Sequence, residues 1–143
     1  MGNVRLVLDT NVVIAGMRSP TGASAALLRA ARRRKIQLVA NVALALEYEA
    51  TCLLVEHRSA AGLSPGEASI FVDAVIALCE PVENSFLWRP QLRDPADELV
   101  LEAAVNGSAD AIVTFNRRDF GTAPQAFGIH LWLPSEALRR IGT

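Results

Sequence analysis

The sequence predicts an α/β fold with a central, mostly parallel β-sheet and helices on both of its faces. Two observations carry this prediction: short runs of Val, Ile and Leu alternate with longer segments of helical spacing, and turn residues separate them. Strands that are joined through helices form βαβ units, in which the strands are parallel. The length of 143 residues and a hydrophobic fraction of 51% fit one domain, residues 1–143, with a substantial core.

The first half of the chain is expected to fold as strand, helix, helix, strand and helix. A β-branched and Leu-rich run predicts the first strand, and a Ser-Pro-Thr-Gly turn closes the short helix after it. An Ala- and Leu-rich segment with a basic end predicts the next helix, and the side chain of Asn41 can cap the third. The corresponding ranges are 4–8, 12–17, 23–35, 36–40 and 42–57. The inner side of the last helix is expected to carry Leu46, Ala50, Leu53 and Leu54.

The clearest local signal in the second half is Ser64-Pro65-Gly66-Glu67, a capping box with proline at the first helical position. The helix that follows is expected to bury Ile70, Phe71, Ala74, Val75 and Leu78.

A proline-punctuated connection over 81–93, with a short strand at Val82, leads to a helix that opens at Asp94 and ends at Gly107. The side chains that this helix is expected to turn inward are Leu101, Ala104 and Val105. Strands over 111–115 and 129–133 and a terminal helix from Pro134 complete the order.

Composition and charge exclude several classes of protein. No apolar run reaches the roughly 18 residues of a membrane span, and the N-terminus lacks the apolar segment of a secretory signal, so we expect a cytoplasmic protein. Cys52 and Cys79 match no metal-binding spacing and are expected to be buried thiols in helical segments. A net charge of −1 argues against binding nucleic acid through bulk charge alone. The basic run Arg32–Lys35 is either a solvated helix end or a contact for a phosphate backbone.

Acidic residues that follow the predicted strands form the candidate site, because open α/β sheets bind ligands beyond the carboxyl ends of their strands. Asp9 directly follows the first strand, and Asn116 and Asp119 follow the fourth. Glu47 lies on the helix after the second strand, and Asp97 lies in the first turn of the helix that leads into the fourth. Clustered carboxylates repel one another unless a cation joins them or they take up protons. Oxygen ligands without Cys or His favour Mg²⁺ or Mn²⁺ over zinc.

These acidic residues also have purely structural explanations. Asp9 and Asp94 can cap the helices that follow them, Asp97 gains from a helix dipole, and Asp119 can be a solvated loop residue. A further choice concerns two glutamates that lie about 200° apart around one helix and cannot both face one site. We choose Glu47 over Glu49, because Glu47 falls beside the expected inner side of its helix. His57 and His130 show no spacing to a partner and are not expected to be catalytic.

Four blocks of the sequence, followed by a closing segment, resemble PIN domains, and among these the VapC-type toxins. The blocks are Leu6–Ile14, Ile36–Val39 with Glu47-Tyr48, Arg93–Glu98 and Ala109–Phe120, and the closing strand and helix are Gly128–Glu136. The resemblance therefore covers almost the whole chain.

The resemblance implies a PIN-like α/β/α sandwich that binds Mg²⁺ or Mn²⁺ and cleaves RNA as an endoribonuclease. It also implies the toxin of a type II toxin–antitoxin system, a homodimer that a cognate antitoxin holds inactive. The catalytic residues that it indicates are Asp9, Glu47, Asp97 and Asp119, and Asn116 is a further metal ligand. The residues expected to contact RNA are Thr10, Asn11, Arg117 and Arg118.

The chain departs from the family at Asn116, where many relatives have Asp. Asn keeps an oxygen ligand but loses a charge, and Asp119 can supply the missing carboxylate if the segment turns helically. Either residue can fill the fourth acidic position, and either one or two ions can bind. The alternative to a nuclease is a non-catalytic PIN-fold module that binds RNA or a protein partner, and Asn116 is the feature that favours it.

Overall fold

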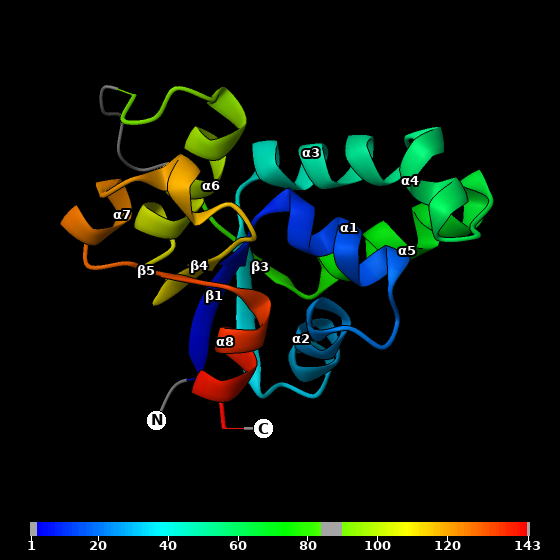
Figure 1. Cartoon of the computed structure of the whole chain (residues 1–143), viewed down its shortest axis with the longest axis horizontal. Coiled ribbons are helices and arrows are strands. Elements are labelled where there is room, and N and C mark those ends of the chain that lie inside the picture. Colours follow the sequence, from blue (N-terminus) through cyan, green and yellow to red (C-terminus); the bar gives the residue numbers. More distant parts are fainter. Residues whose placement is uncertain (1–2, 84–89, 143) are drawn as a thin grey trace.

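Five parallel strands form the centre of the molecule, in the order β3-β2-β1-β4-β5 (Figure 1). The structure is a computed structural model that describes residues 3–83 and 90–142. The strands are β1 (Val4–Leu8), β2 (Ile36–Ala40), β3 (Cys79–Pro81), β4 (Ala111–Val113) and β5 (His130–Trp132). The predicted α/β class is confirmed, and the sheet is entirely parallel rather than mostly parallel.

The central strand β1 is buried on both of its faces. Leu6 pairs with Leu38 of β2 on one side and with Ala111 of β4 on the other. Leu6 and Val7 are fully buried although their side chains point to opposite faces of the sheet. A strand without alternating exposure indicates a layer of helices on each side, as in other parallel sheets.

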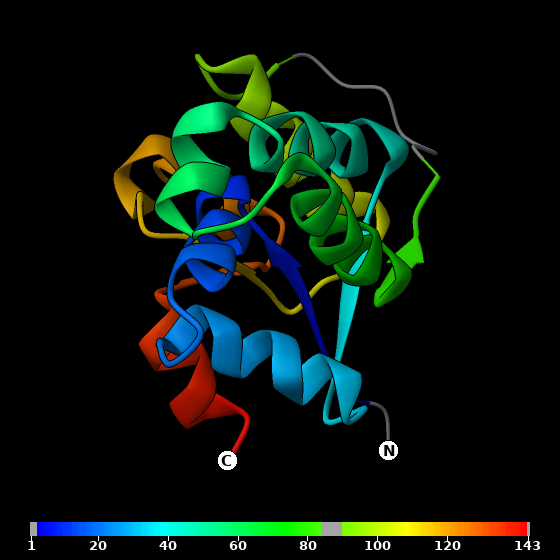
Figure 2. The same ribbon diagram turned by 90° about the vertical axis from the view of Figure 1, so that its right-hand side faces the viewer.

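Two layers of helices enclose this sheet, which gives an α/β/α sandwich. The first layer contains α1 (Thr10–Arg18), α2 (Ala23–Arg32), α3 (Val42–Cys52), α4 (Val55–Ala60), α5 (Pro65–Ala77) and α8 (Pro134–Arg140), the last of which packs against α2. The second contains α6 (Pro95–Asn106) and α7 (Ala123–Ala126). Figure 1 shows α6 and α7 on the left of the sheet and α1–α5 on the right, and Figure 2 looks onto the α1–α5 layer. Right-handed crossovers require this division, because the chain moves outward from β1 to β3 and then returns through α6 to β4.

The predicted helix caps are confirmed. The Ser64 hydroxyl accepts from the Glu67 amide, and the Glu67 carboxylate accepts from the Ser64 amide, which completes the capping box. The side chain of Asn41 accepts from the amide of Leu44, and Asp94 accepts from the amide of Ala96.

The predicted helix 42–57 is wrong in two respects. It is interrupted at Leu53 and Leu54, where Leu54 adopts an extended backbone and begins α4. Its expected inner side is mostly exposed: Leu46 is 60% exposed and Leu54 48% exposed. The buried residues of α3 are Leu44, Tyr48 and Cys52, because the Tyr48 ring fills the core while its hydroxyl donates to the carbonyl of Leu8.

A similar error affects α5. Ile70, predicted to be buried, is 72% exposed, and Ala74 is also exposed. The core side of α5 consists of Ala68, Val72 and Val75. Apolar residues occupy most sides of this helix, so their spacing alone does not distinguish the buried side.

Smaller differences concern the ends of elements. Helix α2 ends three residues before its predicted end, because Arg34 has a left-handed backbone with φ 61°. Strands β4 and β5 are shorter than predicted, and β3 lies just before Val82, whose amide still donates to Ala40. The connection 81–93 lies partly outside the described residues.

The two thiols occupy different environments. Cys52 is buried in α3 as predicted, whereas Cys79 begins β3 rather than lying in a helix. Burial raises the pKa of Cys52 to about 11 and that of Cys79 to about 12, which keeps both thiols protonated and unreactive at neutral pH.

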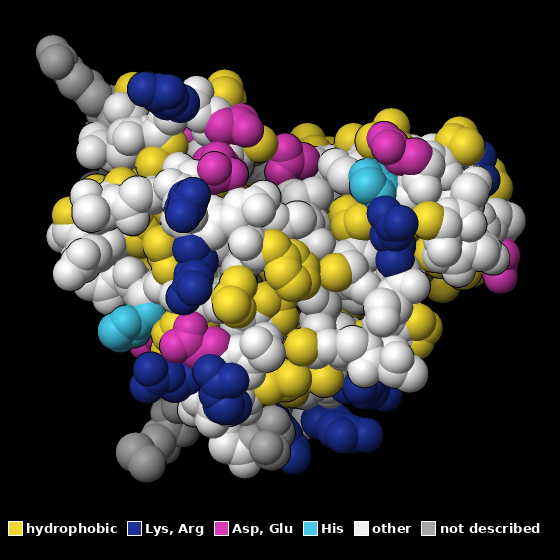
Figure 3. Space-filling model, viewed as in Figure 1, with side chains coloured by type: hydrophobic (Ala, Val, Ile, Leu, Met, Phe, Trp, Pro, Cys, Tyr) yellow, Lys and Arg dark blue, Asp and Glu magenta, His cyan; other side chains and the backbone are white. Residues whose placement is uncertain are grey.

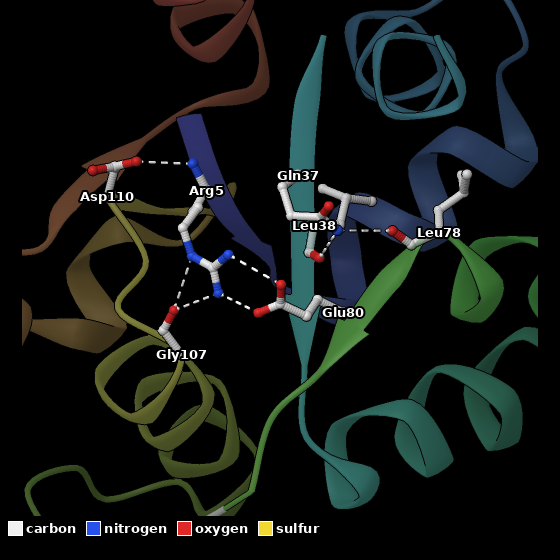
Figure 4. Close-up of polar contacts among 7 residues, drawn as sticks. All are labelled: Arg5, Gln37, Leu38, Leu78, Glu80, Gly107 and Asp110. Carbon is white, nitrogen blue, oxygen red and sulfur yellow. Dashed lines mark hydrogen bonds and ion pairs between the residues drawn. The ribbon is translucent and has the colours of Figure 1, made fainter. Parts of the chain in front are cut away.

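Polar side chains of the protein itself close the amino end of the sheet (Figure 4). The Arg5 guanidinium donates to Glu80 of β3 at 2.5 Å and to the Gly107 carbonyl at 2.8 Å, and the Arg5 amide donates to Asp110. Gly107 ends α6 as predicted, and a Cβ there would lie 2.7 Å from the carbonyl oxygen of Ala103. The Arg5 contact lowers the pKa of Glu80.

No helix in the described ranges, 3–83 and 90–142, is long and apolar enough to cross a bilayer.

Candidate active site

The carboxyl end of the sheet gathers acidic side chains around Asp9, the residue that follows β1. The Asp9 amide donates to the Val113 carbonyl at 2.9 Å, which continues the pairing of β1 with β4 by one residue. Because β1 is the central strand, Asp9 lies in the middle of this edge. Figure 3 shows acidic side chains in the upper part of the molecule, toward which β1 runs in Figure 1.

Asp9 is only 8% exposed, and hydrogen bonds hold both of its carboxylate oxygens. One oxygen accepts from the Thr10 amide at 2.8 Å, which makes Asp9 the cap of α1. The other accepts from the Thr114 hydroxyl at 2.7 Å. Burial raises the pKa of Asp9, the hydrogen bonds from Thr114 and Thr10 oppose this, and the charges of Glu47 and Asp119 raise it further. Asp9 therefore caps α1 and also lies at the centre of the acidic group.

Glu47 reaches the same group from α3. The Thr10 hydroxyl donates to a Glu47 carboxylate oxygen at 2.5 Å, so Thr10 links Asp9 to Glu47 through its amide and its hydroxyl. Glu49 is exposed and lines a separate groove with Val42 and Leu46. The structure therefore brings Glu47, and not Glu49, to Asp9. Glu47 reaches Asp9 because α3 packs against the core through the side that contains Tyr48. The sequence spacing had indicated the side that contains Leu46, which is exposed.

Asp97 approaches from the first turn of α6. Partial burial and the charges of Asp9, Asp94, Asp119 and Glu47 raise its pKa to about 6. The neighbouring Glu98 is buried and serves a different purpose: its carboxylate accepts from the backbone amides of residues 91 and 92. Glu98 thus holds the segment that precedes α6 in the chain, whereas Asp97 lies near the other acids.

Asp119 lies on a 3₁₀ helix, Arg117–Phe120, and Asn116 precedes it. The Asp119 amide donates to the Asn116 carbonyl at 3.0 Å, and residues three apart lie on one side of such a helix. The segment therefore turns helically, which is the condition under which Asp119 can supply the carboxylate that Asn116 lacks. The side chains of both residues are exposed. The charge of Asp119 contributes to the raised pKa of both Asp9 and Asp97, which places it in the same acidic group.

Sequence reasoning missed Thr114, which joins two parts of the site. Its buried hydroxyl donates to Asp9 and accepts from the Asn116 amide at 3.0 Å. A hydroxyl residue directly after a buried apolar strand is the signal that could have identified it. The missed Tyr48 bond to the Leu8 carbonyl likewise fixes α3 against the end of β1.

A cleft of about 700 Å³ opens beside Asp97 and Asp119, between the start of α6 and the segment that includes α7. Arg93 and Arg118 also line it, so the cleft carries both signs of charge. Arg117 lies outside the cleft lining, and its guanidinium is 3.9 Å from Glu136. The run Arg32–Lys35 is exposed but precedes β2, at the amino end of the sheet. The run therefore lies at the opposite end of the sheet from the acidic residues, and its role as a contact for a phosphate backbone stays a prediction.

The donor atoms at this edge of the sheet are all oxygens. Among the described residues, no three Asp, Glu, His or Cys side chains are arranged as a ready metal-binding group. Burial raises the pKa values of Asp9 and Asp97, and the charges of the neighbouring carboxylates raise them further. The side-chain oxygen of Asn11, next to Thr10, is buried and has no hydrogen-bond partner within the described part of the chain. Hard oxygen donors and uncompensated negative charge fit a divalent cation of the Mg²⁺ type.

The family description "PIN domain" matches residues 5–118 of the chain. This range includes Asp9, Glu47, Asp97 and Asn116 and stops one residue before Asp119. No curated protein and no solved structure matches the chain.

The raised pKa of Asp97 predicts a specific pH dependence of stability in the presence of a chelator. Folded Asp97 binds its proton up to about pH 6, whereas the unfolded residue loses it near 3.8, so stability from this group falls as pH rises between these values. Asp97→Asn removes this loss and should gain stability relative to the parent at pH 7 but not at pH 4. Thermal unfolding at intervals from pH 4 to pH 7 measures the difference.

Asp73→Asn, which changes an exposed carboxylate on α5, is the matched control and should parallel the parent. Parallel curves for Asp97→Asn as well would show that folding does not raise the pKa of Asp97.

Proposed function

Because the chain belongs to the PIN domain family, whose members are generally nucleases, we propose that it is a metal-dependent endoribonuclease. One observation carries the proposal: carboxylates from four separate segments meet at the end of the central strand, beside a cleft that two arginines line. A phosphodiester is an anion, and an acidic site can approach it only with the help of cations.

The proposed ligands of Mg²⁺ or Mn²⁺ are Asp9, Glu47, Asp97 and Asp119, with Asn116 as a neutral oxygen ligand. These four acids are also the proposed catalytic residues. When bound, such a cation supplies activation of water as a nucleophile and neutralisation of charge on the phosphoryl oxygens. Burial and the charges of the neighbouring acids raise the pKa of Asp97, which supports this assignment, because a cation would relieve the repulsion between the acids.

The protein's own residues position these acids and the substrate. Thr10 and Thr114 hold Asp9 and Glu47 in place through the bonds described above. Arg118 lines the cleft beside Asp119 and is suited to bind a phosphate oxygen of the RNA. We assign Arg117 and Asn11 to the substrate as well, Asn11 through its buried side-chain oxygen. Contacts of this kind hold the RNA backbone without reading its sequence.

The resemblance to VapC-type proteins supports a finer proposal, that the chain is the toxin of a type II toxin–antitoxin system. It would then act in the cytoplasm as a homodimer, and a cognate antitoxin would bind and inhibit it.

A second candidate function is a non-catalytic PIN module that binds RNA or a protein partner. Asn116 favours it, since this residue lacks the charge that many relatives have there. The absence of a ready metal-binding group among the described residues points the same way. RNA binding without metal-dependent cleavage would identify this module.

Substitution of the acids tests the nuclease proposal. Asp9→Asn and Asp97→Asn should each lower the rate of RNA cleavage by about 100-fold or more, because each removes charge from the site without changing its shape. Glu47→Gln should act in the same direction, whereas its control Glu49→Gln should keep the parent's rate. The measurement is cleavage of mixed RNA pools with Mn²⁺, with Mg²⁺ and with chelator.

Cleavage by the parent in chelator would exclude metal dependence. An inactive Glu49→Gln beside an active Glu47→Gln would contradict the choice between the two glutamates.

The fourth acidic position is tested by metal affinity. If Asp119 supplies the carboxylate that Asn116 lacks, Asp119→Asn should weaken Mn²⁺ binding by about tenfold or more, and excess Mn²⁺ should recover part of the activity. Asn116→Asp should tighten Mn²⁺ binding and destabilise the metal-depleted protein, because it adds a like charge. Calorimetric titration of both variants beside the parent and Asp73→Asn gives the answer. Unchanged affinity and cleavage in Asp119→Asn would remove Asp119 from the site.

A further inference from the structure

A line of basic and aromatic side chains leads away from the cleft along β5 and α8. Arg118, in the cleft, is followed by Arg117, whose guanidinium lies 3.9 Å from one oxygen of Glu136. The other oxygen of Glu136 lies 3.6 Å from Arg140. Arg140 in turn stands 5.9 Å from the ring centroid of Trp132, and Trp132 stacks with His130. We call Arg117, Arg140, Trp132 and His130 the β5–α8 track.

The track keeps a positive charge although Glu136 lies beside both of its arginines. Two guanidinium groups share the single carboxylate of Glu136, which leaves one positive charge in excess. The Arg117 and Arg140 side chains are 51% and 61% exposed, and ion pairs this long and this exposed hold weakly. Phosphate oxygens can therefore replace Glu136 as partners of either arginine. Figure 3 shows Lys and Arg side chains at intervals down the left of the molecule, from its acidic upper edge to its lower end.

The aromatic part of the track forms a platform on the edge strand β5. His130 and Trp132 are two residues apart on the strand, so they lie on one face. Their ring centroids are 5.7 Å apart, and the ring planes differ by 13°. Trp132 is half-buried and anchors the pair, whereas His130 is exposed and offers its ring to solvent. A nucleic acid base stacks on such a ring whatever its sequence.

We propose that a single-stranded segment of the RNA, flanking the cleavage site, follows the β5–α8 track. Its phosphates lie at Arg118, Arg117 and Arg140, and one of its bases extends the stack of His130 and Trp132. The inference rests on the proposed nuclease function and adds a binding subsite to it. Single-stranded RNA fits better than an acidic peptide, because the track places an aromatic stack beside its cations, and alternating phosphates and bases use both.

Binding of labelled single-stranded RNA in the presence of chelator tests the track without requiring cleavage. Two oligonucleotides, of about 4 and about 16 nucleotides, cover the range of single-strand site sizes. His130→Ala should weaken binding of the longer oligonucleotide about tenfold, and His130→Phe, which keeps a stacking ring, should restore it. Arg140→Gln should weaken binding and lower the salt dependence by about 0.7, the value for one phosphate contact. Neither His130→Ala nor Arg140→Gln should change binding of the shorter oligonucleotide.

Arg18→Gln, which removes an exposed arginine at the end of α1, is the charge-matched control and should bind both oligonucleotides as the parent does. Equal affinity of His130→Ala and the parent would overturn the proposal. An effect at Arg140 with none at His130 would also overturn it and would assign the arginines to an acidic protein partner. If the parent binds through the track but never cleaves RNA, the nuclease proposal fails and the track stands. If the parent cleaves RNA and the track variants bind RNA as the parent does, the track proposal fails and the nuclease proposal stands.

Discussion

A carboxylate at the end of a buried central strand must be hydrogen-bonded, and the rest of the site depends on how Asp9 meets this requirement. Its two oxygens accept from Thr10 on α1 and from Thr114 after β4. The same two residues then reach further, Thr10 to Glu47 and Thr114 to the Asn116 amide. Satisfying one buried acid therefore sets the positions of α1, α3 and the 3₁₀ helix that carries Asp119. Removal of the Thr114 hydroxyl would leave Asp9 and the Asn116 amide without this contact, and removal of the Thr10 hydroxyl would leave Glu47 without its contact to α1.

The two ends of the sheet have opposite electrostatic character. At the amino end, Arg5 neutralises Glu80 and caps the Gly107 carbonyl, so charge is balanced within the protein. At the carboxyl end, acids face acids, and burial together with their mutual charges raises the pKa values of Asp9 and Asp97. A fold that held this arrangement for stability alone would gain nothing from the repulsion, which is why we interpret the acidic end as a site for a cation and an anionic substrate.

Sequence patterns predicted features that depend on neighbouring residues along the chain. The strand ends located Asp9, and the caps at Ser64 and Asp94 followed from residues three or fewer positions away. The buried sides of α3 and α5 could not be predicted in this way, because several sides of each helix are apolar and tertiary packing selects one. Thus Leu46 is exposed while Tyr48 is buried. The place of Arg32–Lys35 and the approach of both Arg117 and Arg140 to Glu136 depend on strand direction and strand order, which no local pattern contains.

The central claim is that the four acids form a site for a divalent cation, and thermal unfolding with Mn²⁺ or with chelator tests it most directly. A ligand that binds only the folded protein stabilises it by about 2.7 kcal/mol at a hundredfold excess over its Kd. We predict a rise in Tm of the parent with millimolar Mn²⁺ and no such rise for Asp9→Asn. Identical unfolding curves of the parent with Mn²⁺ and with chelator would contradict the claim.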